Sequence, residues 1–259
     1  MAVPDFLSSA FRFTTLAAVT DVNTIIAGLN TELVTNGTWT DTGGTGVGPF
    51  KSEVGVDGTF FTLTVARLSA TEIQYTVNDW TGILVYNPRQ VIDAGGVNVI
   101  IASGPDYVYV ESGTATPTAF MCCRLRDWPE TPGNVNPNFV CTTGPLTAAG
   151  GATNRYWNLW YSCPAQTRTY GANGFIINRD PYGVTTHLIS PSGALIFTPF
   201  DFADDSDFYL GRVPQVVILD SGLAWGAEYT LTIDSGVTAV FQVCTFVSLS
   251  SRRIAIRKA

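Results

Sequence analysis

The chain has 259 residues, of which 46% are hydrophobic and only 14% are charged, and its net charge is -7. Globular domains average about 25% charged residues, so the polar surface here must come mainly from Thr, Ser, Asn and Gly. This balance excludes a disordered acidic chain, which would need low hydrophobicity. It also argues against a nucleic-acid-binding protein, which needs Lys and Arg to neutralise phosphates. The length is that of one large domain or two modest ones.

Residues 20–35 predict the one helix of the chain. Thr20 or Asp21 can cap its start, and Asn36-Gly37 supplies a left-handed stop. Its apolar residues recur with the helical i, i+3, i+4, i+7 spacing and are Val22, Ile25, Ile26, Leu29 and Leu33.

The remaining chain alternates short apolar segments with Gly, Pro, Asn and Asp turns, which predicts many short strands. No strands alternate with long helices, so we expect an antiparallel β-sandwich or a jelly-roll-like fold. A boundary between two β units, residues 1–113 and 114–259, would lie near Ser112–Thr118, although one continuous domain is equally compatible. The predicted strands are Thr59–Arg67, Glu72–Val77, Val97–Ala102, Tyr107–Glu111, Ala119–Leu125, Arg155–Ser162, Gly174–Asn178, Thr185–Ile189, Ala194–Phe197, Gln215–Leu219, Glu228–Ile233, Ala239–Val247 and Arg252–Arg257.

Two segments are predicted to be loops. Asp41–Gly48 is rich in glycine, but Lys51-Ser52 lies outside the Walker spacing, so we interpret it as a mobile loop and not as a phosphate cradle. Asp127–Thr153 is long and contains four prolines, and it includes Trp128. Loops of this length often contact a partner, and we expect that role here.

The five cysteines are odd in number and include no C-x-x-C pair. We therefore expect buried thiols in a protein made in the cytoplasm, and no native disulfide. The N-terminus lacks the basic and apolar regions of a signal peptide, and no apolar run is long enough to span a membrane.

Two groups of residues are candidates for catalysis or metal binding. His187 is the only histidine, and no Gly-x-Ser-x-Gly motif accompanies it, so a serine triad is disfavoured. The carboxylates of Asp201, Asp204, Asp205 and Asp207 could bind Ca²⁺ or serve as a glycosidase pair, but the EF-hand spacing is absent and a solvated loop is the simpler interpretation. We expect no enzymatic activity and no cofactor.

Two further segments are candidates for interfaces. Tyr156, Trp157 and Trp160 lie in an aromatic segment with apolar residues at both alternations of a strand, which favours a core or a subunit contact over a glycan platform. The C-terminus carries four of the chain's 14 basic residues, and they either protect a sheet edge or dock on an acidic neighbour. These basic residues are Arg252, Arg253, Arg257 and Lys258.

In its overall texture the chain resembles β-rich structural proteins of tailed-bacteriophage virions, of the tail, baseplate or neck type. The stretches that resemble them are Pro49–Leu63, Arg67–Ile73 and Asp106–Ala115. The resemblance implies an architectural role in the virion, in symmetric copies, with other virion proteins and further copies as partners and with neither nucleic acid nor membrane bound. The alternatives are a host-glycan or receptor-binding module and a head decoration or minor capsid protein. A secreted hydrolase is the least favoured interpretation.

Overall fold

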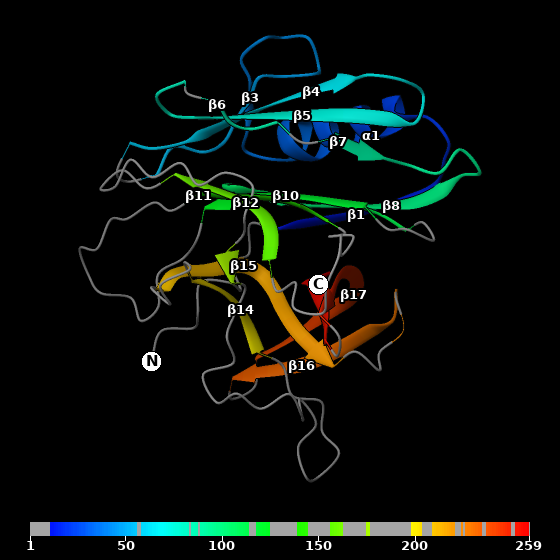
Figure 1. Ribbon diagram of the computed structural model, residues 1–259, viewed down its shortest axis with the longest axis vertical. Coiled ribbons are helices and arrows are strands. Elements are labelled where there is room, and N and C mark those ends of the chain that lie inside the picture. Colours follow the sequence, from blue (N-terminus) through cyan, green and yellow to red (C-terminus); the bar gives the residue numbers. More distant parts are fainter. Residues whose placement is uncertain are drawn as a thin grey trace.

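The computed structural model describes residues 11–55, 58–82, 84–87, 89–113, 118–124, 139–144, 156–162, 175–176, 198–203, 209–220, 224, 226–234, 237–249 and 252–258. The described part of the chain is mainly β, with antiparallel sheets and one helix, which confirms the predicted fold class. The strands pair antiparallel in three sheets that lie one above another (Figure 1). We call them the upper, central and lower sheets, in the order seen in Figure 1.

The upper sheet has the order β2-β3-β4-β5-β6, and β7 also pairs with β5. Its strands are β2 (Thr40–Asp41), β3 (Phe50–Lys51), β4 (Phe61–Arg67), β5 (Glu72–Asp79), β6 (Leu84–Tyr86) and β7 (Arg89–Val91). In β4 and β5 every second residue is buried, with Leu63 and Tyr75 among those that face the core. The alternation of apolar and polar residues in these strands therefore indicates a sheet with one buried face.

The central sheet has the order β1-β8-β9-β10-β11-β12-β13. Its strands are β1 (Arg12–Val19), β8 (Val97–Gly104), β9 (Tyr107–Ser112), β10 (Thr118–Arg124), β11 (Phe139–Gly144), β12 (Tyr156–Ser162) and β13 (Phe175–Ile176). β9 and β10 pair with each other across residues 113–117, so this sheet continues through the boundary that the sequence suggested near Ser112–Thr118.

The lower sheet has the order β14-β15-β18-β17-β16. Its strands are β14 (Thr198–Ala203), β15 (Tyr209–Asp220), β16 (Glu228–Asp234), β17 (Val237–Leu249) and β18 (Arg252–Arg257). A small core that includes Val217, Leu231 and Phe241 lies on one of its faces.

The predicted helix is confirmed as α1 (Val22–Asn30), which lies between the upper and central sheets (Figure 1). Its start is capped by Asp21, whose side chain accepts a hydrogen bond from the N–H of Asn23 at 2.8 Å. The helix does not stop after its α-helical turns but continues as a π-helical turn, η2 (Thr31–Thr35). In this turn Glu32 is buried, and its carboxylate accepts a hydrogen bond from the Thr14 hydroxyl at 2.8 Å.

The middle strands of the central sheet are buried on both faces. Residues such as Val99, Ile101 and Phe120 belong to the core beneath the upper sheet. Tyr109 and Met121 lie on the opposite face, where they line a small cavity together with Val216 and Ile256 of the lower sheet. Burial on both faces explains why β8 and β9 are almost continuously apolar in sequence.

Seven of the described strands were not predicted from the sequence, namely β1, β2, β3, β6, β7, β11 and β14. Of these, β11 lies inside Asp127–Thr153, which was expected to be loop throughout. β1 is an edge strand with mostly exposed or half-buried residues, so it has little apolar alternation to detect. The predicted strands Thr185–Ile189 and Ala194–Phe197 lie outside the described residues.

Candidate functional site

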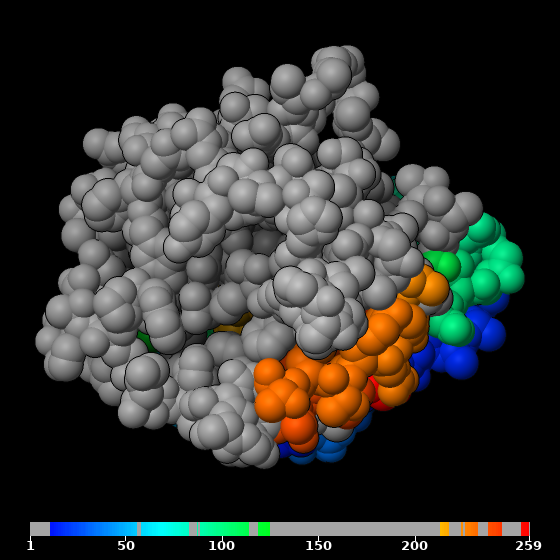
Figure 2. Space-filling model, turned by 90° about the horizontal axis from the view of Figure 1, so that it is seen from below, coloured from blue at the N-terminus to red at the C-terminus, as the bar shows by residue number. Residues whose placement is uncertain are grey.

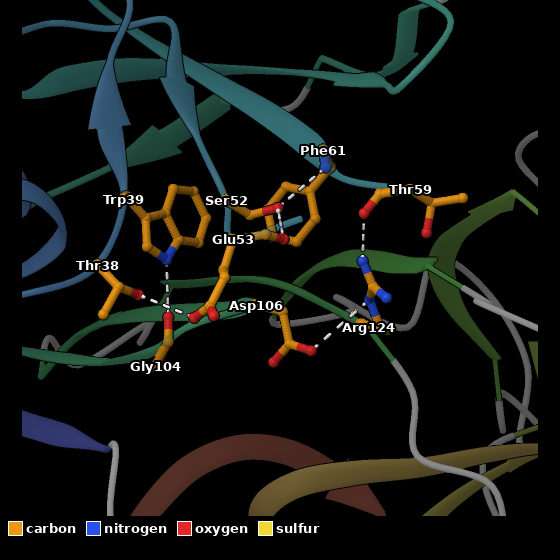
Figure 3. Close-up of polar contacts among 9 residues, drawn as sticks. All are labelled: Thr38, Trp39, Ser52, Glu53, Thr59, Phe61, Gly104, Asp106 and Arg124. Atoms are coloured by element: carbon orange, nitrogen blue, oxygen red, sulfur yellow. Dashed lines mark hydrogen bonds and ion pairs between the residues drawn. The ribbon is translucent and has the colours of Figure 1, made fainter. Parts of the chain in front are cut away.

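A set of buried polar contacts, which we call the seam, joins the upper and central sheets at one end of the molecule (Figure 3). At its centre is Arg124, at the end of β10, whose Nη2 donates to the carbonyl of Thr59 at 2.5 Å. The Nε of Arg124 lies 3.6 Å from Oδ2 of Asp106, and both side chains are only 9% exposed. The guanidinium therefore ties the turn between β8 and β9 to a loop of the upper sheet.

The seam also depends on close backbone approach. A Cβ on Gly55 would lie 1.7 Å from Nη1 of Arg124, so only glycine leaves room for the guanidinium there. Next to it, the indole N–H of Trp39 donates to the carbonyl of Gly104 at 2.7 Å, and the N–H of Glu53 donates to the carbonyl of Pro105 at 2.8 Å. The polar groups of the seam thus bond the two layers to each other.

A second buried polar group lies between the central and lower sheets. The hydroxyl of Tyr109 donates to the carboxylate of Glu111, and the thiol of Cys244 is buried beside both. Burial raises the pKa of Tyr109 and of Cys244, and the neighbouring Glu111 charge raises both further. A thiol whose pKa is raised stays protonated and is a poor nucleophile. We therefore interpret the group of Tyr109, Glu111 and Cys244 as structural.

We expect the protein to lose stability in alkaline solution. Burial raises the pKa of Cys244 above its ordinary 9.0, and the pKa values of Tyr109 and Tyr75 above their ordinary 10.0. Below their ordinary pKa values these groups are protonated in both the folded and the unfolded protein, so their full contribution to the free energy of unfolding is present. Above them the unfolded chain deprotonates first, so the free energy of unfolding falls by about 1.4 kcal/mol per pH unit for each group.

Urea denaturation between about pH 8 and pH 11 measures this loss. Tyr75→Phe removes one titrating hydroxyl, so above pH 10 its unfolding free energy should fall less steeply than that of the wild type. A wild-type unfolding free energy that stays constant up to pH 11 would show that these groups titrate normally in the folded protein.

The basic C-terminal residues contact other strands of the same chain. The Arg257 guanidinium lies 4.0 Å from the centre of the Phe11 ring and donates to Oε1 of Gln215 at 3.3 Å. The Lys258 ammonium lies 2.6 Å from a carboxylate oxygen of Glu228 and 5.7 Å from the centre of the Phe13 ring. Figure 2 shows the described residues of β16 and β17 in orange at the surface close to the blue N-terminal residues.

The position of β18 corrects one interpretation of the basic C-terminus. β18 pairs with β15 on one side and with β17 on the other, so it is not a sheet edge that charges would protect. In register, Arg252 lies opposite Asp220 and Arg253 opposite Leu219. That any of these four basic residues docks on another subunit stays a prediction.

The glycine-rich loop after β2 is organised by its first residue. Asp41 accepts hydrogen bonds from the N–H groups of Gly43, Gly44 and Gly46 at 3.1, 3.0 and 2.7 Å. These are the donors that a phosphate would need, and the Asp41 carboxylate already occupies them. The geometry supports the interpretation that this loop is not a phosphate cradle.

The surface that best fits a contact with another molecule is the outer face of the upper sheet. Here the residues of β4 and β5 that alternate with the core residues form the cross-strand pairs Thr62–Asn78, Thr64–Thr76 and Ala66–Gln74, of which Ala66 is exposed and the others are half-buried. We call these six residues the threonine face. None of them is charged. Charged residues flank these six. Lys51 lies opposite Thr62 in register, and Arg89, which lies opposite Gln74, forms an ion pair with Glu72 at 3.3 Å.

The other predicted site residues are only partly placed. Tyr156, Trp157 and Trp160 lie in β12, which pairs with β11 and β13 inside the central sheet. Asp201 lies in β14, opposite Arg212. Trp128, His187, Asp204, Asp205 and Asp207 lie outside the described residues, so the calcium site stays a prediction. The sequence missed Arg124 and the threonine face. An arginine after an apolar strand and an alternation of threonines were the available signals.

Within the described ranges, no group of three His, Cys, Asp or Glu residues could hold a metal ion. Among the same residues, no helix has the length and hydropathy needed to cross a bilayer. No protein-family model matches the chain, and no curated protein matches its sequence.

Proposed function

We propose that the protein is a non-enzymatic structural subunit of a tailed-phage virion, of the tail, baseplate or neck, and that it assembles in symmetric copies. The observation that carries the proposal is the threonine face, a cluster of six uncharged, mostly half-buried residues in a chain of net charge -7. Charged residues are depleted at the centre of protein interfaces, because a charge that loses its water must find a partner. Two copies, each of net charge -7, repel each other overall, but a contact through the six residues of the threonine face adds no charged side chains of its own.

The layered packing gives the proposal further support. At the seam Arg124 bonds the central sheet to a loop of the upper sheet, and Cys244 of the lower sheet is buried beside Tyr109 and Glu111 of the central sheet, so polar contacts join the three layers. A rigid body suits a repeated contact, since little conformational freedom is lost when copies associate. The resemblance to β-rich virion proteins supports the same conclusion.

A pair of opposite charges placed on the threonine face tests the proposal. Thr64→Lys with Thr76→Glu puts an ion pair across β4 and β5, where the two residues face each other in register. The fold should persist, because opposite charges in a cross-strand pair do not repel. The interface should weaken by at least about 10-fold, because both charges must lose water when a partner covers them.

The lower sheet offers a matched control. Thr232 and Thr238 are exposed and form a direct cross-strand pair between β16 and β17, as Thr64 and Thr76 do between β4 and β5. Thr232→Lys with Thr238→Glu should therefore assemble as the wild type does. Incorporation of each variant into purified particles, measured by quantitative mass spectrometry, gives the readout. Equal incorporation of the Thr64/Thr76 variant and the wild type would refute the proposed contact.

A further inference from the structure

Two cysteines that are 19 residues apart in sequence meet in the central sheet. β10 and β11 pair antiparallel, and Cys122 and Cys141 are direct partners in their register. Cys122 is completely buried, in the core beneath the upper sheet. The segment that joins the two strands, residues 125–138, lies between these two positions in the chain.

Direct cross-strand partners are spaced suitably for a disulfide. Their Cβ atoms lie about 4.5–5.5 Å apart, and the shorter end of this range meets the Cβ separation of about 3.5–4.5 Å that a disulfide needs. Their Cα separation of about 4.5–5.5 Å also falls within the range found in disulfides. Little backbone movement is needed to join two such positions.

The register also selects this pair over its neighbour. Cys123 follows Cys122 directly, but successive residues of a strand point to opposite faces. Cys123 lines the small cavity on the side of the lower sheet, and its direct partner in β11 is Val140. Cys244 is buried in the lower sheet beside Glu111. Of the cysteines in the described strands, only Cys122 and Cys141 are direct partners in a strand register.

We propose that Cys122 and Cys141 are a modification site, a thiol pair that oxidises to an intramolecular disulfide when the chain folds in the presence of a low-molecular-weight disulfide such as oxidised glutathione. The thiolate of one cysteine attacks the oxidant, forms a mixed disulfide and releases one glutathione thiol. The second thiolate then attacks the protein sulfur of that mixed disulfide and releases the second glutathione thiol. The protein loses two hydrogen atoms and two electrons, and the oxidant becomes two reduced thiols.

The disulfide would fasten β10 to β11 on either side of a long connection. The central sheet would then stay joined even if the chain were cut between residues 125 and 138. This inference does not depend on the proposed function, because it concerns one sheet within one chain. In the structure Cys122, Cys123 and Cys244 are buried thiols, as expected from the sequence, and the proposal concerns what Cys122 becomes under oxidising conditions.

Refolding of the full chain from denaturant in a glutathione redox buffer tests the proposal, because both thiols are accessible before the sheet forms. After alkylation of the remaining thiols, trypsin should release Gln90–Arg124 joined to Asp127–Arg155, as expected from the arginines of the sequence. Reduction should separate the two peptides. We expect most of the refolded protein to carry this link.

Two variants identify the partners. Cys123→Ala should leave the link intact, because Cys123 is on the other face of β10. Cys122→Ala should abolish it, and near-ultraviolet circular dichroism would show that this variant has folded. The proposal is overturned if the refolded wild type has both cysteines alkylated, if Cys123 forms the link, or if Asp127–Arg155 is joined instead to the Cys163 peptide Tyr156–Arg168.

Discussion

Truncation after Ser250 is expected to unfold the lower sheet. It deletes β18, which lies between β15 and β17 and supplies hydrogen bonds to both. It also removes Ala255 and Ile256, which are completely or almost completely buried. Burial of one large aliphatic side chain contributes about 1.5–3 kcal/mol, and two strands would lose their shared partner, so the loss approaches the 5–15 kcal/mol that stabilises a typical domain.

Point variants separate this structural role from a docking role of the basic residues. Arg257→Gln with Lys258→Gln keeps β18 and removes two charges, so the lower sheet should remain folded with a loss of about 1–2 kcal/mol from the contacts with Phe11, Phe13 and Glu228. Limited proteolysis and circular dichroism compare the two proteins. A truncated chain as protease-resistant as the wild type would contradict the placement of β18.

Arg124→Ala is expected to lower the free energy of unfolding by about 3–5 kcal/mol, because it leaves the buried carboxylate of Asp106 without its cationic neighbour. It also removes the hydrogen bond to the carbonyl of Thr59, and with it a link between the upper and central sheets. Urea denaturation followed by circular dichroism measures the loss.

A double variant distinguishes the effect of leaving Asp106 without its partner from the effect of lost packing. Arg124→Met with Asp106→Leu removes both charges and keeps apolar volume, so it should cost less than Arg124→Ala alone. Arg67→Ala is a suitable control, because its ion pair with Asp21 is open to solvent and should contribute little to stability. A similar small loss for Arg124→Ala would show that the seam does not hold the layers together.

Local sequence pattern predicted the elements whose residues alternate between core and solvent. α1 has one buried stripe, and β4 and β5 each have one buried face, so their periods of 3.6 and 2 are visible in the sequence. β11 has a short apolar segment between proline-rich stretches, and its place in the central sheet is determined by β10 and β12. No local pattern contains that information.

The candidate sites were harder to predict, because their residues come from distant parts of the chain. Arg124 contacts the carbonyl of Thr59, 65 residues away, and Lys258 pairs with Glu228 from another strand. The C-terminal charges were recognised as unusual, but their partners follow from strand order, which a single sequence does not reveal. The same holds for Cys122 and Cys141, whose meeting depends on the register of β10 and β11.

The molar mass of the purified protein in solution, determined by light scattering over a range of concentrations, tests the central claim most directly. One chain has a mass of 27.8 kDa. If the protein is a subunit that assembles in symmetric copies, the mass should approach a whole-number multiple of this value as concentration rises. The Thr64→Lys/Thr76→Glu variant should then remain at the mass of one chain. A wild-type protein that keeps the mass of one chain at every concentration, and that is absent from purified particles, would contradict the account.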